Sequence, residues 1–210
     1  MEKILLVGAG GHCKVVISII LKNDNYEIYG ISDEKKSLHG QKILDYNISF
    51  SEKNWSDISL YCKNALVAFG NTDIPYQRKK IFEKLKKYHF ELPIIISKDS
   101  IIAEDVKIGE GSVVMPGAVI NPGTVIGKNC IINTGCVIDH DCNIGEHTHI
   151  APGVTCSGGV FIDKLCHIGT GATIIQSIII GYETLVAAGA VVVKNIPQKS
   201  RVKGVPAKLF

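Results

Sequence analysis

The feature that most limits how this chain can fold is an aliphatic residue at every sixth position from Ile102 to Val192, interrupted only by Cys156. A period of six is neither the period of about 3.6 of an α-helix nor the alternation of one long strand. Short strands separated by turns are therefore expected, which is the pattern of a parallel β-helix built from hexapeptides. The series comprises Ile102, Ile108, Val114, Ile120, Ile126, Ile132, Ile138, Ile144, Ile150, Cys156, Ile162, Ile168, Ile174, Ile180, Val186 and Val192.

A second, mostly small residue precedes most of these aliphatic residues by two positions. On an extended chain, residues two apart share a face, so both sets should point into one core. If three hexads make one coil, the run makes about five coils and residues eighteen apart stack in a column. The small residues are Ser112, Ala118, Thr124, Cys130, Cys136, Cys142, Thr148, Cys166, Ala172, Thr184 and Ala190.

Composition and cysteine usage exclude several classes of protein. Seven cysteines occur without a CxxC pair, and because four of them occupy small inward positions, we expect buried free thiols rather than disulfides or metal ligands. A formal net charge of +3 without a basic run interleaved with aromatics argues against nucleic-acid binding. No apolar stretch approaches the roughly 20 residues of a membrane span, and the N-terminus lacks the order of a signal peptide, so a cytoplasmic protein is expected.

Residues 1–97 follow a different pattern, in which strands alternate with helices. This alternation predicts a small parallel α/β domain, half of a Rossmann-like fold, followed by the β-helix with its C-terminal tail over residues 98–210. A lysine-rich amphipathic helix should bury Ile81, Leu85 and Tyr88, and residues 33–64 predict no definite element. The strands are expected at Ile4–Val7, Glu27–Ile31, Ala65–Phe69 and Leu92–Ile96.

A glycine-rich turn joins the first strand to a helix. Gly8 and Gly10 match the first two glycines of G-x-G-x-x-G, but Cys13 holds the third place. About 95 residues make only half of a dinucleotide fold, so NAD is disfavoured. A glycine turn before a helix N-terminus suits an anion such as a diphosphate. A tight turn without a ligand remains the alternative.

The densest polar break in the repeat is Asp139-His140-Asp141. An imidazole titrates near neutral pH, so His140 could accept a proton during a reaction. The periodicity leaves open whether His140 points inward or lies at a corner, and which of the two aspartates orients it. A histidine with only a structural role also remains an alternative.

The hexad run resembles the left-handed β-helix of the hexapeptide-repeat acyltransferases. With the segment NTGCVIDHDCNIGEHTHIAPG, the start LLVGAGGH and the end GVPAK, the whole chain resembles bacterial sugar acetyltransferases. This family includes UDP-4-amino-sugar N-acetyltransferases, perosamine N-acetyltransferases and sialic acid O-acetyltransferases. The resemblance implies an acetyl-CoA-dependent enzyme that acetylates the amino group of a nucleotide-linked amino sugar, without a metal. It also implies a homotrimer with acetyl-CoA between neighbouring β-helices.

The resemblance also assigns site residues. It implies His140 as general base, with Asp141 as the acid that raises its basicity, where many relatives have Glu. Contacts to acetyl-CoA fall on His149, Thr170 and Ala188. Contacts to the nucleotide sugar fall on Gly10, Gly11, His12, Ser32, Asp33 and Gly70, and Ser32-Asp33 stands where some members have an acidic pair.

Other readings of the same residues stay open. Acetylation of sialic acid on oxygen is the alternative within the family. His149 and His167 are eighteen apart and should stack, with His167 expected at the surface, and a metalloenzyme like the γ-class carbonic anhydrases would need a third histidine at suitable spacing. A non-catalytic nucleotide-sugar sensor is a further alternative. The basic tail suits a phosphate-rich cofactor or simple solubility; it carries Lys194, Lys199, Arg201, Lys203 and Lys208.

Overall fold

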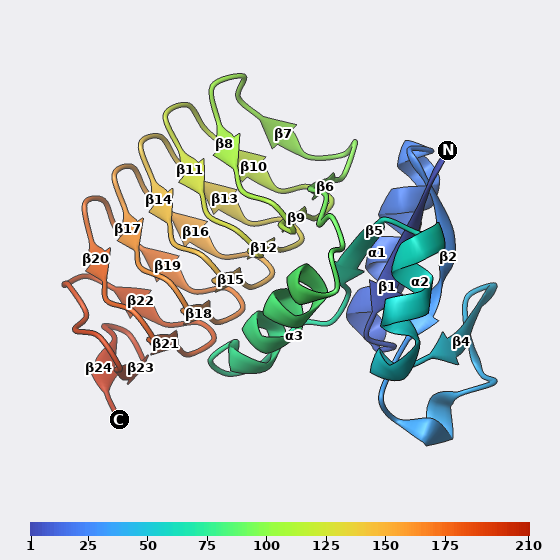
Figure 1. Cartoon of the computed structure of the whole chain (residues 1–210). Helices are drawn as coiled ribbons and strands as arrows, with labels where there is room; N and C mark the ends of the chain where they lie inside the picture. Colours follow the sequence, from blue (N-terminus) through green and yellow to red (C-terminus); the bar gives the residue numbers. More distant parts are fainter.

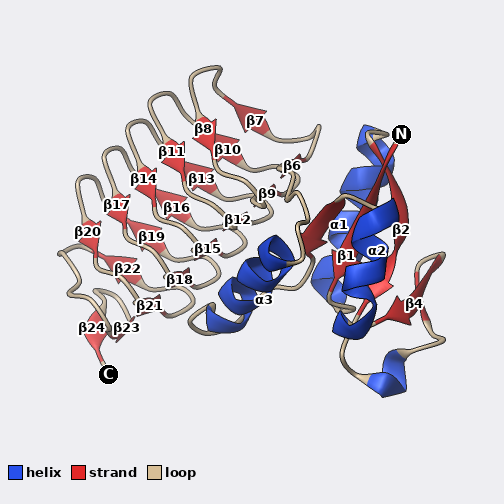
Figure 2. Cartoon of the chain, in the orientation of Figure 1, coloured by secondary structure: helices blue, strands red, loops and turns tan.

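The computed structural model describes residues 1–210 as an α/β part followed by a left-handed parallel β-helix. Figure 1 shows the coils of the β-helix stacked on one side and the α/β part on the other, with α3 (Tyr76–Lys87) at the junction. Figure 2 shows only strands and loops after α3. No helix has the length and apolarity needed to cross a bilayer.

The α/β part contains a five-stranded sheet with the strand order β3-β4-β2-β1-β5. All neighbouring strands are parallel except β3 and β4. The strands predicted at Ile4–Val7, Glu27–Ile31 and Ala65–Phe69 are confirmed as β1, β2 and β5, and residues 33–64 add β3, β4 and α2. The elements are β1 (Glu2–Val7), α1 (Gly11–Asn23), β2 (Tyr26–Ser32), β3 (Lys42–Ile43), β4 (Tyr46–Phe50), α2 (Trp55–Tyr61) and β5 (Asn64–Val67), with 3-10 turns at Lys36–Leu38 and Glu52–Asn54.

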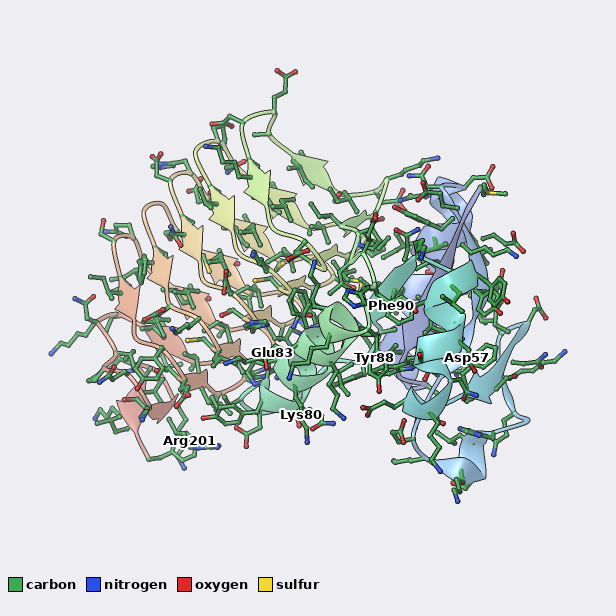
Figure 3. The ribbon with its side chains drawn as sticks, viewed as in Figure 1. Asp57, Lys80, Glu83, Tyr88, Phe90 and Arg201 are labelled. Atoms are coloured by element: carbon green, nitrogen blue, oxygen red, sulfur yellow. The ribbon has the colours of Figure 1, made fainter.

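Alternation along β1 gives this sheet two buried faces. Ile4 and Leu6 pack with the apolar side of α1, whereas Leu5 and Val7 pack with α2 and α3. As predicted, α3 buries Ile81 and Leu85, whereas Tyr88, which was expected on the same face, follows the helix and is only partly buried. The lysine-rich side of α3 is largely exposed; Lys80 and Glu83 are labelled on it in Figure 3. The two faces explain why a strand as apolar as β1 lies at an inner position.

The β-helix has three walls, each a parallel sheet of very short strands. Wall 1 contains β7 (Ile101–Ile102), β10 (Val119–Ile120), β13 (Val137–Ile138), β16 (Thr155–Cys156), β19 (Thr173–Ile174) and β22 (Val191–Val192). Wall 2 contains β8 (Lys107–Ile108), β11 (Val125–Ile126), β14 (Asn143–Ile144), β17 (Phe161–Ile162) and β20 (Ile179–Ile180). Wall 3 contains β6 (Ile95–Ile96), β9 (Val113–Val114), β12 (Ile131–Ile132), β15 (His149–Ile150), β18 (His167–Ile168), β21 (Leu185–Val186), β23 (Arg201–Lys203) and the antiparallel β24 (Lys208–Leu209).

The hexad register predicted from the sequence is confirmed. Residues eighteen apart pair in register, as Ile120 pairs with Ile138 and Ile138 with Cys156. From Val114 to Val192 every member of the series is at most 2% exposed. Ile102 and Ile108 are less buried because they belong to the first coil, which has no coil on its outer side.

The small inward residues also hold the corners together. Ser112 Oγ donates to the carbonyl of Gly127 at 2.8 Å, and Cys130 Sγ donates to the carbonyl of Gly145 at 3.2 Å. These side chains satisfy carbonyl groups that turns would otherwise leave unpaired inside the core. All seven cysteines are buried and free, as expected, and burial raises the pKa of most of their thiols.

One predicted strand belongs to the other part of the molecule. Leu92–Ile96 was expected to complete the α/β sheet, which is wrong: only Ile95–Ile96 is a strand, and it pairs with β9 in wall 3. Val113 of β9 lies in the same apolar cluster as Ile17 of α1. The β-helix therefore shares a core with the α/β part, and an apolar run cannot reveal which of the two sheets it joins.

A buried arginine at this junction was not predicted. Arg78 of α3 is 1% exposed and its guanidinium contacts four carbonyl groups and no carboxylate. The acceptors are Val67 O (2.6 Å), Phe69 O (3.0 Å), Asn129 O (3.3 Å) and Gly111 O (3.5 Å). Burial lowers the pKa of Arg78 to about 9. Val67 ends β5 and Phe69 follows it, whereas Gly111 and Asn129 lie on adjacent coils, so Arg78 ties the two parts together.

Replacing Arg78 with methionine should therefore lower the free energy of unfolding by about 2–4 kcal/mol, because buried carbonyl groups lose their donors. Lys80→Met on the exposed side of α3 is the matched control and should change it by less than about 0.5 kcal/mol. Chemical denaturation measures both variants. Equal stability of the two variants would show that Arg78 does not tie the two parts together.

Candidate active site

His140 lies at the corner between walls 1 and 2, in the turn from β13 to β14. Its Nδ1 is 2.8 Å from Oδ2 of Asp141, and both side chains are largely exposed, at 61% and 73%. The hydrogen bond to Asp141 raises the pKa of His140, and the charge of Asp139 adds to the effect. The imidazole is therefore basic and exposed to solvent, and its Nδ1 is hydrogen-bonded to the carboxylate of Asp141.

Asp139 has a different role from Asp141, which the sequence left open. Oδ1 of Asp139 accepts hydrogen bonds from Nδ2 of Asn121 at 2.9 Å and from the backbone N–H of His140 at 2.8 Å. These contacts hold the turn. Asp141 itself has a φ of 57°, a left-handed conformation that aspartate tolerates better than most residues. This conformation brings its carboxylate to the imidazole ring.

The glycine turn opens onto an apolar groove of about 420 Å³. Trp55, Phe69 and Ile81 supply its apolar lining, and Gly10 lies at its rim. A Cβ placed on Gly10 or Gly11 meets nothing within 4 Å, so space above the turn is open. Gly10 makes no side-chain cap, which leaves the first N–H groups of α1 available to an anion.

Ser32 and Asp33 line this groove but are engaged within the protein. Ser32 is 1% exposed, and its Oγ accepts a hydrogen bond from Nε1 of Trp55 at 2.9 Å. The Asp33 carboxylate accepts the N–H groups of Ala9 and Lys35, each at 2.9 Å. Asp33 therefore pins the glycine turn, and Ser32 fixes the tryptophan that lines the groove.

A second, polar cleft of about 530 Å³ lies on the other side of the glycine turn. Gly11, His12, Gly70 and His149 line it together, although they come from both parts of the molecule. A Cβ placed on Gly70 would lie 3.7 Å from the rings of both His12 and His149. Nε2 of His12 has no hydrogen-bond partner. Asn71, which was not among the predicted site residues, also lines this cleft.

His149 and His167 lie in one column as predicted, and their rings meet edge to face with centroids 5.0 Å apart. The expectation that His167 lies at the surface is wrong, because it is 8% exposed under the loop that follows β5, and Asn71 lies 3.4 Å from its Nδ1. His149 contacts the carbonyl of Asn71 at 3.1 Å and Nδ2 of Asn133 at 3.0 Å. Burial lowers the pKa of His149 and of His12 to about 3, so both rings are neutral near pH 7.

Thr170 and Ala188 continue a column that begins in this cleft. Thr134 and Pro152 line the cleft at the corner between walls 3 and 1. Gly171 N donates to Pro152 O at 2.9 Å and Gly189 N donates to Thr170 O at 2.9 Å, which stacks the coils there. The exposed Thr170 and Ala188 therefore form a ridge that leads away from His149.

The predicted site residues thus lie at two different corners. The turns from β10 to β11 and from β13 to β14 follow the upper edge of the β-helix in Figure 1, whereas the α/β part lies to its right. His140 and Asp141 lie at the corner between walls 1 and 2. The two clefts are lined by residues of the α/β part and of wall 3 with its corner to wall 1. Within one chain, wall 1 separates the imidazole from the polar cleft.

Metal ligands and the basic tail were also considered in the sequence as contacts for ligands. No three His, Cys, Asp or Glu side chains are grouped as a metal site requires. Arg201 of the basic tail, labelled in Figure 3, pairs with Asp73 at 2.8 Å and lowers its pKa. This ion pair links the tail to the loop that covers His167.

A left-handed β-helix with an exposed histidine–aspartate pair and an attached α/β part defines a transferase of the hexapeptide-repeat class. Residues 3–85 match the family described as PglD N-terminal domain, and residues 123–158 match the bacterial transferase hexapeptide family (six repeats). No curated protein matches the chain significantly.

Solved structures match the whole chain. A perosamine N-acetyltransferase variant from Caulobacter crescentus, in complex with CoA and GDP-perosamine, is 31% identical over 100% of this chain and 97% of its own, with a TM-score of 0.94. The acetyltransferase domain of PglB from Neisseria gonorrhoeae FA1090 is 32% identical over 100% of both chains, with a TM-score of 0.91. WeeI from Acinetobacter baumannii AYE is 27% identical over 100% of both chains, with a TM-score of 0.83. The chain belongs to the hexapeptide-repeat family of sugar N-acetyltransferases.

Proposed function

We propose that this protein transfers an acetyl group from acetyl-CoA to the amino group of a nucleotide-linked amino sugar, a UDP- or GDP-linked 4-amino sugar. The observation that carries the proposal is the exposed His140–Asp141 pair, joined at 2.8 Å. In addition, the α/β part matches the PglD N-terminal domain and the β-helix matches the bacterial transferase hexapeptide family. The relative with CoA and GDP-perosamine bound supports the substrate class.

In this proposal His140 is the general base. Asp141 accepts a hydrogen bond from Nδ1–H of His140, so Nε2 carries the lone pair that takes a proton from the sugar amine. The amine nitrogen bonds to the thioester carbon while His140 holds the proton, and the C–S bond then breaks. The imidazolium returns the proton to the CoA thiolate, which leaves as the thiol. Asp141 stabilises the transient imidazolium, and the thioester is attacked directly.

The two clefts have complementary chemistry for a nucleotide sugar. The groove with Trp55, Phe69 and Ile81 offers an apolar surface for a base, and the open N–H groups after Gly10 suit the diphosphate. The polar cleft offers neutral imidazole, amide and hydroxyl groups to the sugar, including the unpaired Nε2 of His12. Acetyl-CoA would follow the ridge from His149 toward Thr170 and Ala188.

The proposed assembly is a homotrimer in which acetyl-CoA lies between neighbouring β-helices. Its support is that one chain holds His140 and the polar cleft at opposite edges of wall 1. A neighbouring copy that presents its own corner to the cleft would complete the site. His140 of one copy would then act on a sugar held by the next.

Thiol release from acetyl-CoA tests the proposed reaction. The purified protein is assayed with UDP- and GDP-linked 4-amino sugars, the corresponding sugars without the amino group, and free sialic acid. We expect release of CoA only with an amino sugar, and the preferred nucleotide identifies the natural carrier. Release of CoA with free sialic acid alone would overturn the proposal. The absence of release with every amino sugar of the panel would also overturn it.

A further inference from the structure

One glycine of the β-helix has neither of the usual reasons to be glycine. Nine β-helix glycines, such as Gly159 with a φ of 68°, occupy left-handed turn positions. Five others, such as Gly145, face the backbone of the next coil, where a Cβ would collide with main-chain atoms. Gly158 has no left-handed φ, and its nearest neighbours are side-chain atoms of His140.

The imidazole of His140 lies directly against Gly158. A Cβ placed on Gly158 would be 2.5 Å from Nε2, 2.6 Å from Cε1 and 3.1 Å from Cδ2 of that ring. Two carbon atoms in contact are separated by about 3.5–4.0 Å, so any side chain at this position would have to displace the ring. The N–H of Gly159 donates to the carbonyl of His140 at 2.9 Å, which fixes the spacing of the two coils.

The neighbours in this column show that the turn itself accepts a side chain. Pro122, His140, Gly158 and Gln176 are spaced by eighteen residues and occupy the same place in successive coils. Every member except Gly158 carries a Cβ. Because Gly158 stands one coil beyond His140, its missing side chain serves the ring above it rather than the local turn.

We infer that Gly158 is a positioning residue for His140: it is the flat surface on which the imidazole rests so that Nδ1 meets Asp141. This inference rests on the proposed function, in which His140 is the base. The carboxylate is confined in the same way on the preceding coil, where a Cβ on Gly123 would collide with Oδ1 of Asp141. Gly123 has a φ of 75°, so its turn needs glycine too, and Gly158 is the cleaner position to test.

Gly158→Ala should fold normally, because the exposed imidazole can swing away at little cost. We expect kcat to fall between about tenfold and a hundredfold, the range that a displacement of about 1 Å produces in a catalytic group. The KM for acetyl-CoA should be unchanged. Gln176→Ala, an exposed position in the same column, is the matched control and should keep full activity.

The pH dependence distinguishes positioning from a general structural effect. Asp141 raises the pKa of His140, so a ring displaced from Asp141 has a lower pKa. The base must be neutral to act, and the acidic limb of kcat should therefore move to lower pH in Gly158→Ala. The NMR titration of the His140 ring should show the same decrease without any turnover.

Combining Gly158→Ala with His140→Ala completes the test. If Gly158 acts through the imidazole, the double variant should be no slower than His140→Ala alone. A wild-type rate and an unchanged His140 pKa in Gly158→Ala, or a further loss of rate in the double variant, would overturn the inference. Failure of the proposed function would instead appear in the wild-type protein, which would release no thiol with any amino sugar.

Discussion

His140→Ala is expected to lower kcat by about 10² to 10⁴-fold, the usual contribution of a positioned general base. The amine would have to lose its proton to water while it attacks the thioester. Acetyl-CoA binding, measured by calorimetry, should be retained, because the imidazole is exposed and only its Nδ1 contact with Asp141 is lost. Steady-state kinetics with the preferred amino sugar gives the decrease.

Asp141→Asn provides the graded comparison for this prediction. The imidazole remains but loses its charged partner, so the pKa of His140 falls and the acidic limb of the rate profile moves to lower pH. Its kcat should lie between those of the wild type and His140→Ala. Near-normal turnover of His140→Ala with any sugar of the panel would rule out His140 as the base.

Ile138→Asp is expected to prevent folding or to lower the free energy of unfolding by about 5 kcal/mol or more, because it places an unpaired charge in the stacked core. Ile138 is fully buried and pairs with Ile120 above and Cys156 below. Its neighbours offer no partner for a carboxylate. Soluble yield and thermal unfolding measure the effect.

Lys164→Asp introduces the same residue at an exposed turn position and should leave the melting temperature within a few degrees of the wild type. The difference between the two variants isolates burial from the change of charge. Equal melting temperatures of Ile138→Asp and Lys164→Asp would mean that the hexad register is wrong.

The architecture of the β-helix was determined by the sequence alone. Each coil buries the same positions, so the sixfold spacing from Val114 to Val192 reports directly which side chains point inward. Four of the cysteines, Cys130, Cys136, Cys142 and Cys166, could be placed for the same reason, because small inward positions recur with the same spacing. The strands β1, β2 and β5 were also predictable, since each is a short apolar run next to a turn.

Contacts between the two parts of the molecule were decided only by the tertiary structure. Ile95–Ile96 joins wall 3 rather than the α/β sheet. Arg78 has the spacing of the buried face of α3, three residues before Ile81 and seven before Leu85, but a charged side chain does not by itself indicate burial. His167 follows the surface register of its strand and is nevertheless buried, because the loop after β5 covers wall 3. Burial of this kind depends on residues nearly a hundred positions away.

The site shows the same division between local and distant information. The Asp139-His140-Asp141 sequence marks the reactive corner, but three consecutive residues do not reveal which carboxylate meets the ring; the left-handed φ of Asp141 decides it. The stacking of coils then decides what lies beneath the imidazole, which is Gly158. Local spacing therefore identifies the chemical groups, whereas the distances between them depend on how coils and domains pack.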